Sequence, residues 1–329
     1  MLSKKNNLLI FGESITDETF IRRLKPLKKG PFRIGFDTMV DTNWEKDIKI
    51  QVIGLNYTLP NLFRSEIFMN YGKIFHLKDY KKIYLNHPEK AINLLRKEVQ
   101  SALENEVVHI DKVEYYDVFE KLLMISFKGL NPYSYDKKLS LSERYLYSKQ
   151  LANKFNQYIK NDNDFDLFTK KINKYFELLK LNGINDSQVF HYINKSQNKL
   201  WVNILELIIS FPLCVFGLIF NYIPYVITSS IVEKIFKRPV FWNAVKVLIG
   251  GLIGFIFQFI ILLFIYFNFI DNLLLTGLIG LLLPISGIFS YEYFRFYADV
   301  KSQFNLNRTS DLKNIVELRS HLSSILSDI

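Results

Sequence analysis

Hydrophobic and polar positions divide the first part of the chain into short strand-like runs and helical runs. The strand-like runs are Leu8–Phe11, Ile48–Tyr57 and Glu66–Phe75. A helix is expected from Phe32–Val40, and Pro88–Val107 has apolar residues at helical spacing with charges on the other face. Because strands and helices alternate, the pattern predicts an α/β fold over residues 1–130.

A helical, amphipathic pattern follows from about Val113 to Asn198. The run Ser140-Leu-Ser-Glu143 has the spacing of a capping box, which marks the start of a helix. The polar run "KNDNDFD" at 160–166 predicts a turn between two helices. We therefore expect a helical connector over residues 131–200.

Three strongly apolar segments indicate a helical membrane domain over residues 201–292. Val245–Asn268 forms a helix of about 36 Å, which is enough to cross a bilayer, and Leu273–Ser290 is just long enough. Two prolines interrupt the first segment, Leu207–Ile227. We expect this segment to be re-entrant or to lie in the membrane interface, and the other two to form a helical hairpin.

Charge bias bears on the orientation of these segments. Basic residues follow the first segment and the third: Lys234, Lys237, Arg238, Lys246, Arg295, Lys301 and Arg308. If the first segment does not cross, the N-terminal domain and both basic groups face the cytoplasm; if it crosses, the domain lies opposite them. We expect the former, with Asp271 at the outer tip of the hairpin and residues 293–329 as a cytoplasmic amphipathic tail. The predicted location is the inner cell membrane, with several passes.

Small and polar residues within the apolar segments are expected to serve helix packing. Close helix approach is the usual role of glycines such as Gly250-Gly251, Gly277 and Gly280. A single amide, such as that of Gln258, more often bonds across a helix interface than marks a polar site. The lone cysteine, Cys214, is expected to be a small packed hydrophobe.

Composition limits the classes of partner and cofactor. The 329 residues are 49% hydrophobic and carry a formal net charge of +10, which suits anionic lipid headgroups or phosphorylated substrates. The chain has no arginine-rich arm and no RNP-like aromatic pattern, so we expect no nucleic-acid partner. One cysteine excludes an intrachain disulfide and a cysteine-based zinc site. No metal and no cofactor is expected.

The opening stretch "LIFGESITDETFIRRLKPLKKGPFRIGF" at 9–36 combines an acid with a basic turn. A carboxylate there can accept a hydrogen bond from a substrate hydroxyl, while lysines neutralise a nearby phosphate. The candidate binding residues are Glu13, Lys25, Lys28, Lys29 and Gly30. The alternative is a solvated loop on an α/β domain.

This stretch resembles the third motif of the glycerolipid acyltransferase family, the lysophosphatidate-acyltransferase-like enzymes. There a strand ends in Phe-Pro-Glu-Gly-Thr and a Leu-Leu-Pro-Phe-Lys-Lys-Gly turn follows. "IQVIGLNY" at 50–57 resembles the family's fourth block, in the same order and at a fitting separation. The runs at 211–227 and 237–250 resemble membrane segments of the larger bacterial and fungal glycerol-3-phosphate acyltransferase branch.

The resemblance implies a membrane enzyme of phospholipid biosynthesis. It would transfer a fatty acyl group from acyl-CoA or acyl-carrier protein to glycerol 3-phosphate or 1-acylglycerol 3-phosphate (lysophosphatidate). Glu13 matches the motif glutamate that holds the acceptor's hydroxyl region, and Lys25, Lys28, Lys29 and Gly30 match the basic turn. Val52–Ile53 match the hydrophobic fourth block near the acyl path, or are simply buried strand residues.

The sequence also departs from the family pattern. Gly12, Ser14 and Gln51 stand where the family has proline, glycine and proline. The family's catalytic histidine, followed by four residues and an aspartate, should precede Glu13 by many tens of residues, but only twelve residues precede it. We therefore expect the catalytic pair upstream of Met1. The chain would be the C-terminal part of an acyltransferase α/β domain with its connector and membrane domain, either truncated or divergent and inactive alone. The alternative is a non-catalytic membrane protein with a lipid-phosphate binding surface.

In the family the catalytic histidine precedes the motif that contains the glutamate, but all five histidines of this chain follow Glu13. The family's histidine removes the acceptor hydroxyl proton, and its aspartate orients the imidazole. Four residues separate His109 from a glutamate in "HIDKVE", a match that we interpret as chance. His87 precedes Pro88 and is expected to start a helix. His76, His191 and His321 complete the set.

Overall fold

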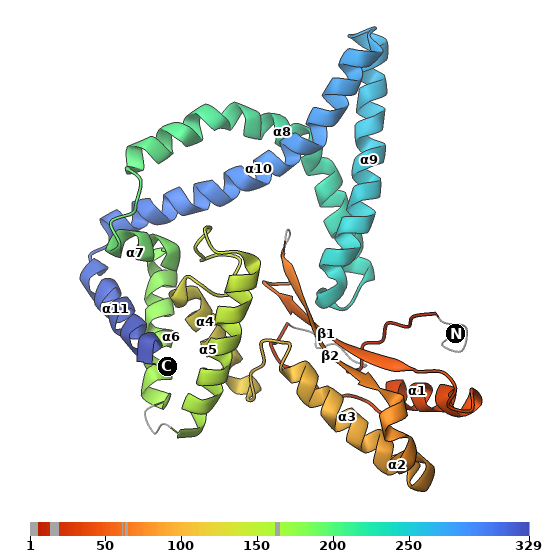
Figure 1. Cartoon of the computed structure of the whole chain (residues 1–329). Coiled ribbons are helices and arrows are strands. Elements are labelled where there is room, and N and C mark those ends of the chain that lie inside the picture. The colour runs from red at the N-terminus through yellow and green to blue at the C-terminus, as the bar shows by residue number, and fades with distance from the viewer. Residues whose placement is uncertain (1–5, 14–19, 61, 63–64, 162–164, 329) are drawn as a thin grey trace. The chain divides into compact units, whose positions relative to one another are not determined.

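The computed structural model describes the chain except for residues 1–5, 14–19, 61, 63–64, 162–164 and 329 (Figure 1). The chain forms two compact units. The first comprises residues 1–60 and 64–165, and the second residues 61–63 and 166–328. The division falls within the segment 131–200 that the sequence pattern treats as one connector. Each unit is described by itself.

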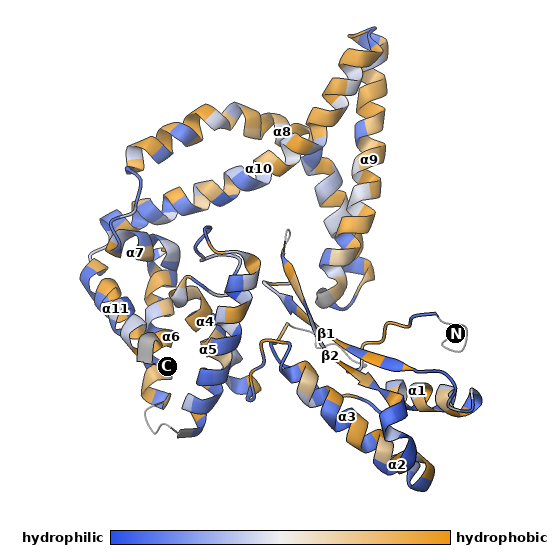
Figure 2. Cartoon of the chain, viewed as in Figure 1, coloured by the Kyte–Doolittle hydropathy of each residue, from blue (hydrophilic) through white to orange (hydrophobic). Residues whose placement is uncertain are grey.

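All regular secondary structure in the described residues of the second unit is helical. Its α-helices are α6 (Phe165–Asn182), α7 (Asp186–Ile193), α8 (Leu200–Ile235), α9 (Trp242–Asn268), α10 (Leu273–Arg308) and α11 (Leu312–Asp328), with a short 3-10 turn, η4 (Pro239–Phe241). Three of them, α8, α9 and α10, are long and apolar enough to cross a membrane. Figure 2 shows hydrophobic residues concentrated along these three helices. The protein is therefore a membrane protein, as the sequence predicts.

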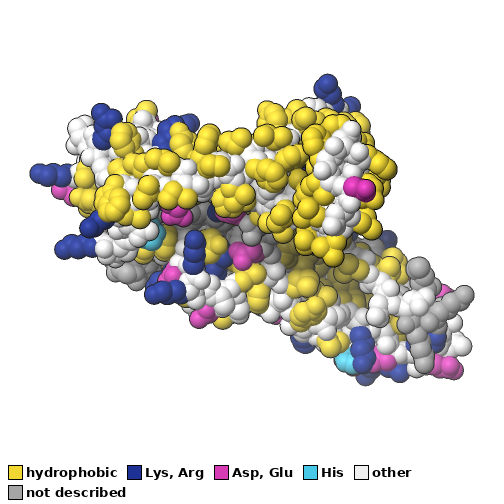
Figure 3. Space-filling model, turned by 90° about the horizontal axis from the view of Figure 1, so that it is seen from above, with side chains coloured by type: hydrophobic (Ala, Val, Ile, Leu, Met, Phe, Trp, Pro, Cys, Tyr) yellow, Lys and Arg dark blue, Asp and Glu magenta, His cyan; other side chains and the backbone are white. Residues whose placement is uncertain are grey.

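The exposed surface of the long helices is itself apolar. Figure 3 shows a broad field of hydrophobic side chains over them, with few charges among them. On α9, for example, Leu248, Phe255 and Ile260 are all exposed. A face of this kind is stable in contact with lipid rather than water.

The apolar segment 207–227 lies within one continuous helix. Pro212 and Pro224 are both inside α8, which bends along its length (Figure 1). Neighbouring helices and local adjustments satisfy backbone groups freed by proline, so a membrane helix tolerates it. The re-entrant or interfacial placement of this segment stays a prediction. The expected helices 245–268 and 273–290 are present as α9 and the first half of α10, and Asp271 lies in the loop between them.

Hydrogen bonds pair α8 and α10 in antiparallel fashion. Asn203 Nδ2 donates to Gln303 Oε1 (2.8 Å), and further along Ser290 Oγ donates to the carbonyl of Cys214 (2.9 Å). Cys214 is buried, as predicted. A Cβ on Gly217 would lie 2.1 Å from Ser286 O, so the two backbones approach too closely for any larger residue.

Among the predicted packing glycines, Gly250 and Gly280 lie against side chains of neighbouring helices. A Cβ on Gly250 would meet Thr228 at 3.2 Å, and one on Gly280 would meet Leu262 at 2.9 Å. The prediction is wrong for Gly251 and Gly277, where a Cβ would have nothing within 4 Å. These two positions face open space.

The predicted amphipathic helix at the end of the chain is present as α11. Its apolar side chains Ile315 and Leu322 are fully buried. Arg319 reaches α7, where its Nε and Nη2 donate to the two carboxylate oxygens of Asp186 at 2.8 and 3.1 Å. Tyr175 of α6 donates to the same carboxylate at 2.7 Å. The helix is thus joined to α6 and α7 by a buried ion pair whose carboxylate also accepts a hydrogen bond from Tyr175.

The first unit combines helices with one β-hairpin. Its elements are α1 (Gly30–Asp41), β1 (Lys49–Tyr57), β2 (Ile67–His76), η2 (Leu77–Tyr80), α2 (Lys81–Asn86), α3 (Pro88–Glu104), η3 (Val113–Tyr115), α4 (Tyr116–Ser126) and α5 (Leu141–Asn161). The strands pair antiparallel, with Tyr57 opposite Ile67 and Lys49 opposite His76.

The predicted α/β acyltransferase fold is wrong for the described residues, which are mostly helical with a single two-stranded sheet. The predicted strand Leu8–Phe11 has no regular structure, and Leu9 and Phe11 are largely exposed. The runs at 48–57 and 66–75 are strands, but a short loop joins them. They therefore pair with each other as a hairpin rather than through a helical crossover, which a parallel sheet requires.

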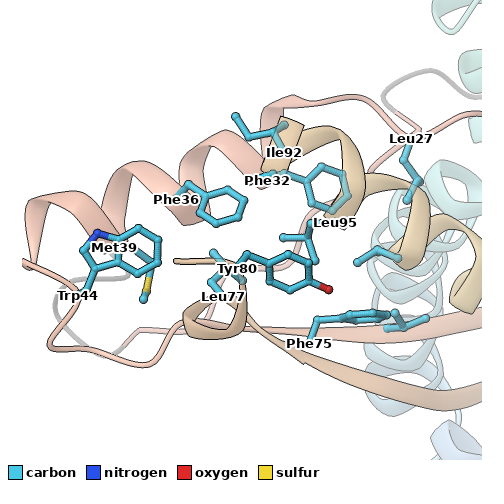
Figure 4. Packing of buried hydrophobic residues seen from close by; sticks show 13 residues of the cluster. Leu27, Phe32, Phe36, Met39, Trp44, Phe75, Leu77, Tyr80, Ile92 and Leu95 are labelled. Atoms are coloured by element: carbon cyan, nitrogen blue, oxygen red, sulfur yellow. The ribbon is translucent and has the colours of Figure 1, made fainter. Parts of the chain in front are cut away.

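Helices α1 and α3 pack on the hairpin around one hydrophobic core. Figure 4 shows the rings of Phe32 and Phe36 from α1 facing Leu95 from α3, with Leu77 beneath them. Phe36 also stacks on Tyr84 with ring centroids 4.5 Å apart. The buried positions of α3 repeat at the helical spacing that the sequence predicts.

The start of α5 matches the predicted capping box. Ser140 N donates to Glu143 Oε2 at 2.7 Å, and Glu143 N donates back to Ser140 Oγ at 3.3 Å. Helix α5 ends at Asn161 and α6 begins at Phe165, which agrees with the predicted break. Residues 162–164 of the expected turn lie outside the described residues.

Candidate functional site

The two halves of the opening motif meet at Gly12. The amide of Lys28 donates to the carbonyl of Gly12 at 2.8 Å, so the chain folds back on itself. A Cβ on Gly12 would lie 2.9 Å from Leu27 Cδ2, so a larger residue there would require the Leu27 side chain to shift. Glu13, the next residue, is half-buried. Ser14 lies outside the described residues.

Residues of helix α3 hold the basic turn in place through contacts with Leu27. Leu27 is 5% exposed and belongs to the hydrophobic core. Its amide donates to Gln100 Oε1 at 2.9 Å, and its carbonyl accepts from Arg96 Nη1 at 3.3 Å. The turn is therefore fixed by the buried Leu27 side chain and by two hydrogen bonds from or to side chains of α3. The residues on either side of Leu27, Pro26 and Lys28, are exposed.

The predicted lysines differ in their surroundings. Lys28 is exposed and Lys25 is half-buried. Lys29 Nζ lies 2.9 Å from Glu89 Oε2, and Arg33 Nη2 lies 2.6 Å from the other oxygen of Glu89. Hydrogen bonds from Lys29 and Arg33 lower the pKa of the Glu89 carboxyl. Two cations on one carboxylate leave a net positive charge beside the turn.

Two members of this cluster, Arg33 and Glu89, were missed from the sequence. Arg33 stands four residues after Lys29, a spacing that places neighbours on one helix face and could have identified it. Glu89 lies in the first turn of α3, sixty positions from Lys29, and no local pattern connects the two. Gly30 is the first residue of α1, and a Cβ there would have nothing within 4 Å. Its place in the motif is thus not explained by close packing.

The second motif block packs against the first. Val52 on β1 is 3% exposed and lies in the same hydrophobic cluster as Leu27, Phe32 and Phe36. Ile53 is half-buried and points to the opposite face of the hairpin. Val52 therefore has the role of a buried strand residue, one of the two alternatives for this pair.

One histidine contacts the opening stretch within the described part of the chain. His109 Nδ1 accepts a hydrogen bond from the amide of Leu24 at 3.0 Å, and its Nε2 lies 3.7 Å from Asp111. Burial lowers the pKa of this imidazole. The other histidines have polar contacts elsewhere or begin a helix: His76 with Asp47, His191 with Ser196, His321 with Lys171, and His87 at the start of α3, as predicted.

The described residues contain no group of three or more side chains arranged to hold a metal ion. Comparisons with protein-family models, with curated proteins and with solved structures gave no match. The site is thus described by its own geometry: an anchored turn that carries cations, bonded through its backbone to Gly12, with the half-buried Glu13 next in the chain.

Proposed function

We propose that this chain is the membrane-bound, acceptor-binding part of a glycerolipid acyltransferase. The observation that carries the proposal is the meeting of the two motif blocks: Lys28 N bonds to Gly12 O, and Leu27 shares a core with Val52. The acceptor is glycerol 3-phosphate or 1-acylglycerol 3-phosphate, and the donor is a thioester of coenzyme A or of acyl-carrier protein.

The chemistry of the acceptor calls for opposite charges placed close together. The Glu13 carboxylate accepts a hydrogen bond from the acceptor hydroxyl, and the exposed Lys28 ammonium contacts the phosphate. Lys29 and Arg33, held by Glu89, add positive potential near the same turn. Lys25 belongs to the same set.

A membrane location suits this proposal because the acylated product is a lipid. Helices α8, α9 and α10 place the chain in the bilayer. We assign it to the inner cell membrane with the first unit on the cytoplasmic side, where acyl-CoA and acyl-carrier protein are made. With α8 re-entrant or interfacial, the basic residues around the α8–α9 loop and in the second half of α10 support this orientation.

Acyl transfer also requires a general base. In the family a histidine paired with an aspartate removes the acceptor's hydroxyl proton as its oxygen attacks the thioester carbonyl. The C–S bond then breaks, and the thiol of coenzyme A or of acyl-carrier protein leaves with the proton that the imidazolium returns. The proposed reaction takes that pair from outside these 329 residues, so the chain alone binds the acceptor without turning it over.

The test is acceptor binding by the full 329-residue chain reconstituted in phosphatidylcholine vesicles. We expect saturable binding of labelled glycerol 3-phosphate or lysophosphatidate, about tenfold weaker in Lys28→Ala, which corresponds to about 1.4 kcal/mol. Lys82→Ala, an exposed lysine of α2, is the matched control and should bind normally. Absence of acceptor binding would overturn the proposal. Acyl transfer by the chain alone would show that the general base does not come from outside these 329 residues.

The two-stranded sheet favours a second candidate, a non-catalytic membrane protein with a lipid-phosphate binding surface. This protein would bind phosphatidate in vesicles through the same lysines. Adding any preceding coding sequence that supplies the histidine–aspartate pair distinguishes the two, because only the acyltransferase then incorporates labelled acyl chains.

A further inference from the structure

The outer face of the β-hairpin is apolar although it is exposed. Ile67, Met69, Tyr71 and Ile74 on β2 are 50%, 53%, 65% and 46% exposed. Opposite the first three, β1 presents Tyr57, Leu55 and Ile53, which are half-buried. An antiparallel sheet with one face in water normally places polar residues on that face, whereas this hairpin places apolar residues there.

An irregularity in β2 keeps this face continuous. Ile53 pairs with Tyr71 and Gln51 with Ile74, so β2 has two residues, Gly72 and Lys73, where β1 has only Val52. The extra residue returns Ile74 to the outer face and puts Phe75 into the core, where it is 4% exposed. Without it the alternation would place Ile74 inside.

We propose that this face of the hairpin lies on the surface of an anionic bilayer. The inference does not rest on the proposed function. The three membrane helices of the same chain keep the first unit close to lipid, so a bilayer is always within reach. Contiguous exposed apolar surface of this kind marks an interaction site.

The composition of the face favours the bilayer interface over an apolar protein partner. Tyr57 and Tyr71 have an apolar ring and a polar tip, which suits the headgroup level of a membrane. Lys49, paired with His76, and the exposed Lys73 border the apolar rows. The Lys49 stem can lie along the lipid while its ammonium group meets anionic headgroups; Asp47 lies 3.6 Å from Lys49 Nζ and offsets part of that charge. Lys73 Nζ lies 4.8 Å from the centre of the Phe75 ring, so its ammonium group already has a partner within the protein.

The test places one fluorescent label on the full chain in vesicles. Cys214, the single cysteine, is replaced by alanine, and a new cysteine at Met69 carries an environment-sensitive dye. Leu85→Cys is the matched control, because Leu85 is an exposed apolar residue of the same unit, on α2, with 62% exposure. Quenching is measured with spin-labelled phospholipid, in phosphatidylcholine with and without phosphatidylglycerol.

We expect the dye at Met69 to be quenched several-fold more than the dye at Leu85, and more strongly with phosphatidylglycerol present. Equal quenching at the two positions would overturn the proposal. Self-quenching of the Met69 dye that unlabelled chain relieves would also overturn it, because it would show a second copy on this face. Tyr71→Cys gives an independent position if Met69→Cys does not fold.

Discussion

Gln258 and Asn221 join two membrane helices through one amide bond: Gln258 Nε2 on α9 donates to Asn221 Oδ1 on α8 at 2.9 Å. Asn221 Nδ2 in turn donates to the carbonyl of Leu283 on α10 at 3.1 Å. The prediction that Gln258 bonds across a helix interface is therefore confirmed. Asn221 is the point at which α8, α9 and α10 meet.

This junction predicts energetic coupling between Asn221 and Gln258. Replacing each with leucine, singly and together, should give a coupling energy of about 0.6–1.7 kcal/mol, the range found for hydrogen bonds between membrane helices. The measurement is unfolding in mixed detergent micelles. Asn268→Ala is the control, since Asn268 bonds only to Phe264 O within its own helix among the described contacts. Additive single effects would show that the bond contributes nothing.

Comparing alanine substitutions at Gly217, which lies at the α8–α10 contact, and at Gly251, which does not, tests how closely α8 and α10 pack. Gly217→Ala puts a methyl 2.1 Å from Ser286 O, a backbone atom that can move only with its helix, so we expect a loss of about 1–3 kcal/mol. Gly251→Ala, with nothing within 4 Å, should be neutral or stabilising by up to about 1 kcal/mol. The same detergent unfolding experiment measures both. Equal effects of the two substitutions would contradict the close approach.

The sequence predicted local structure better than it predicted topology. Helical spacing gave the buried positions Ile92, Leu95 and Val99 of α3, and the capping box at Ser140 gave the start of α5. These signals are local, because a residue and its partner stand three or four positions apart. The α/β prediction failed because Leu8–Phe11 joins no sheet and the two remaining strands, connected by a short loop, pair only with each other. Whether an apolar run such as Leu8–Phe11 becomes a strand depends on a partner far away in the sequence.

The candidate site shows the same division. Glu13 and the lysines were readable because they stand in one motif. Glu89 was not, since nothing near it in sequence indicates that it pairs with Lys29. Likewise, His109 reaches Leu24 across eighty-five positions, and only the folded chain reveals that contact.

Two substitutions in the opening motif separate hydroxyl binding from phosphate binding in the complete enzyme. If the chain has the proposed acyltransferase function, Glu13→Ala should lower both turnover and acceptor affinity strongly, because the carboxylate would then accept a hydrogen bond from the reacting hydroxyl. Lys28→Ala should mainly raise the acceptor's KM, by about tenfold, with kcat nearly unchanged. Steady-state kinetics with varied acceptor measure both. Unchanged parameters in both variants would remove these residues from the site.

The buried ion pair between α7 and α11 predicts non-additive stability effects. Arg319→Met leaves Asp186 charged and buried, which should cost about 3–5 kcal/mol. The double variant Asp186→Leu with Arg319→Met should lose less than Arg319→Met alone, because no uncompensated charge remains. Both side chains are nearly inaccessible to water, so screening by salt is weak. Chemical denaturation followed by circular dichroism measures these differences, and a double variant less stable than the single one would contradict the argument.

His109 predicts that the first unit loses stability in acid. Burial lowers the pKa of its imidazole below the ordinary value of about 6.5, so the unfolded chain binds the proton more readily than the folded one. Stability from this group is therefore fully present above about pH 6.5 and is lost as the pH falls below that value. Protonation would also put a hydrogen on Nδ1, which accepts from Leu24 N. Denaturation of the full chain at pH 7.5 and 5.5, compared with His109→Gln, measures the effect; the variant should show a smaller difference between the two pH values, and an equal difference would rule out His109 as the titrating group.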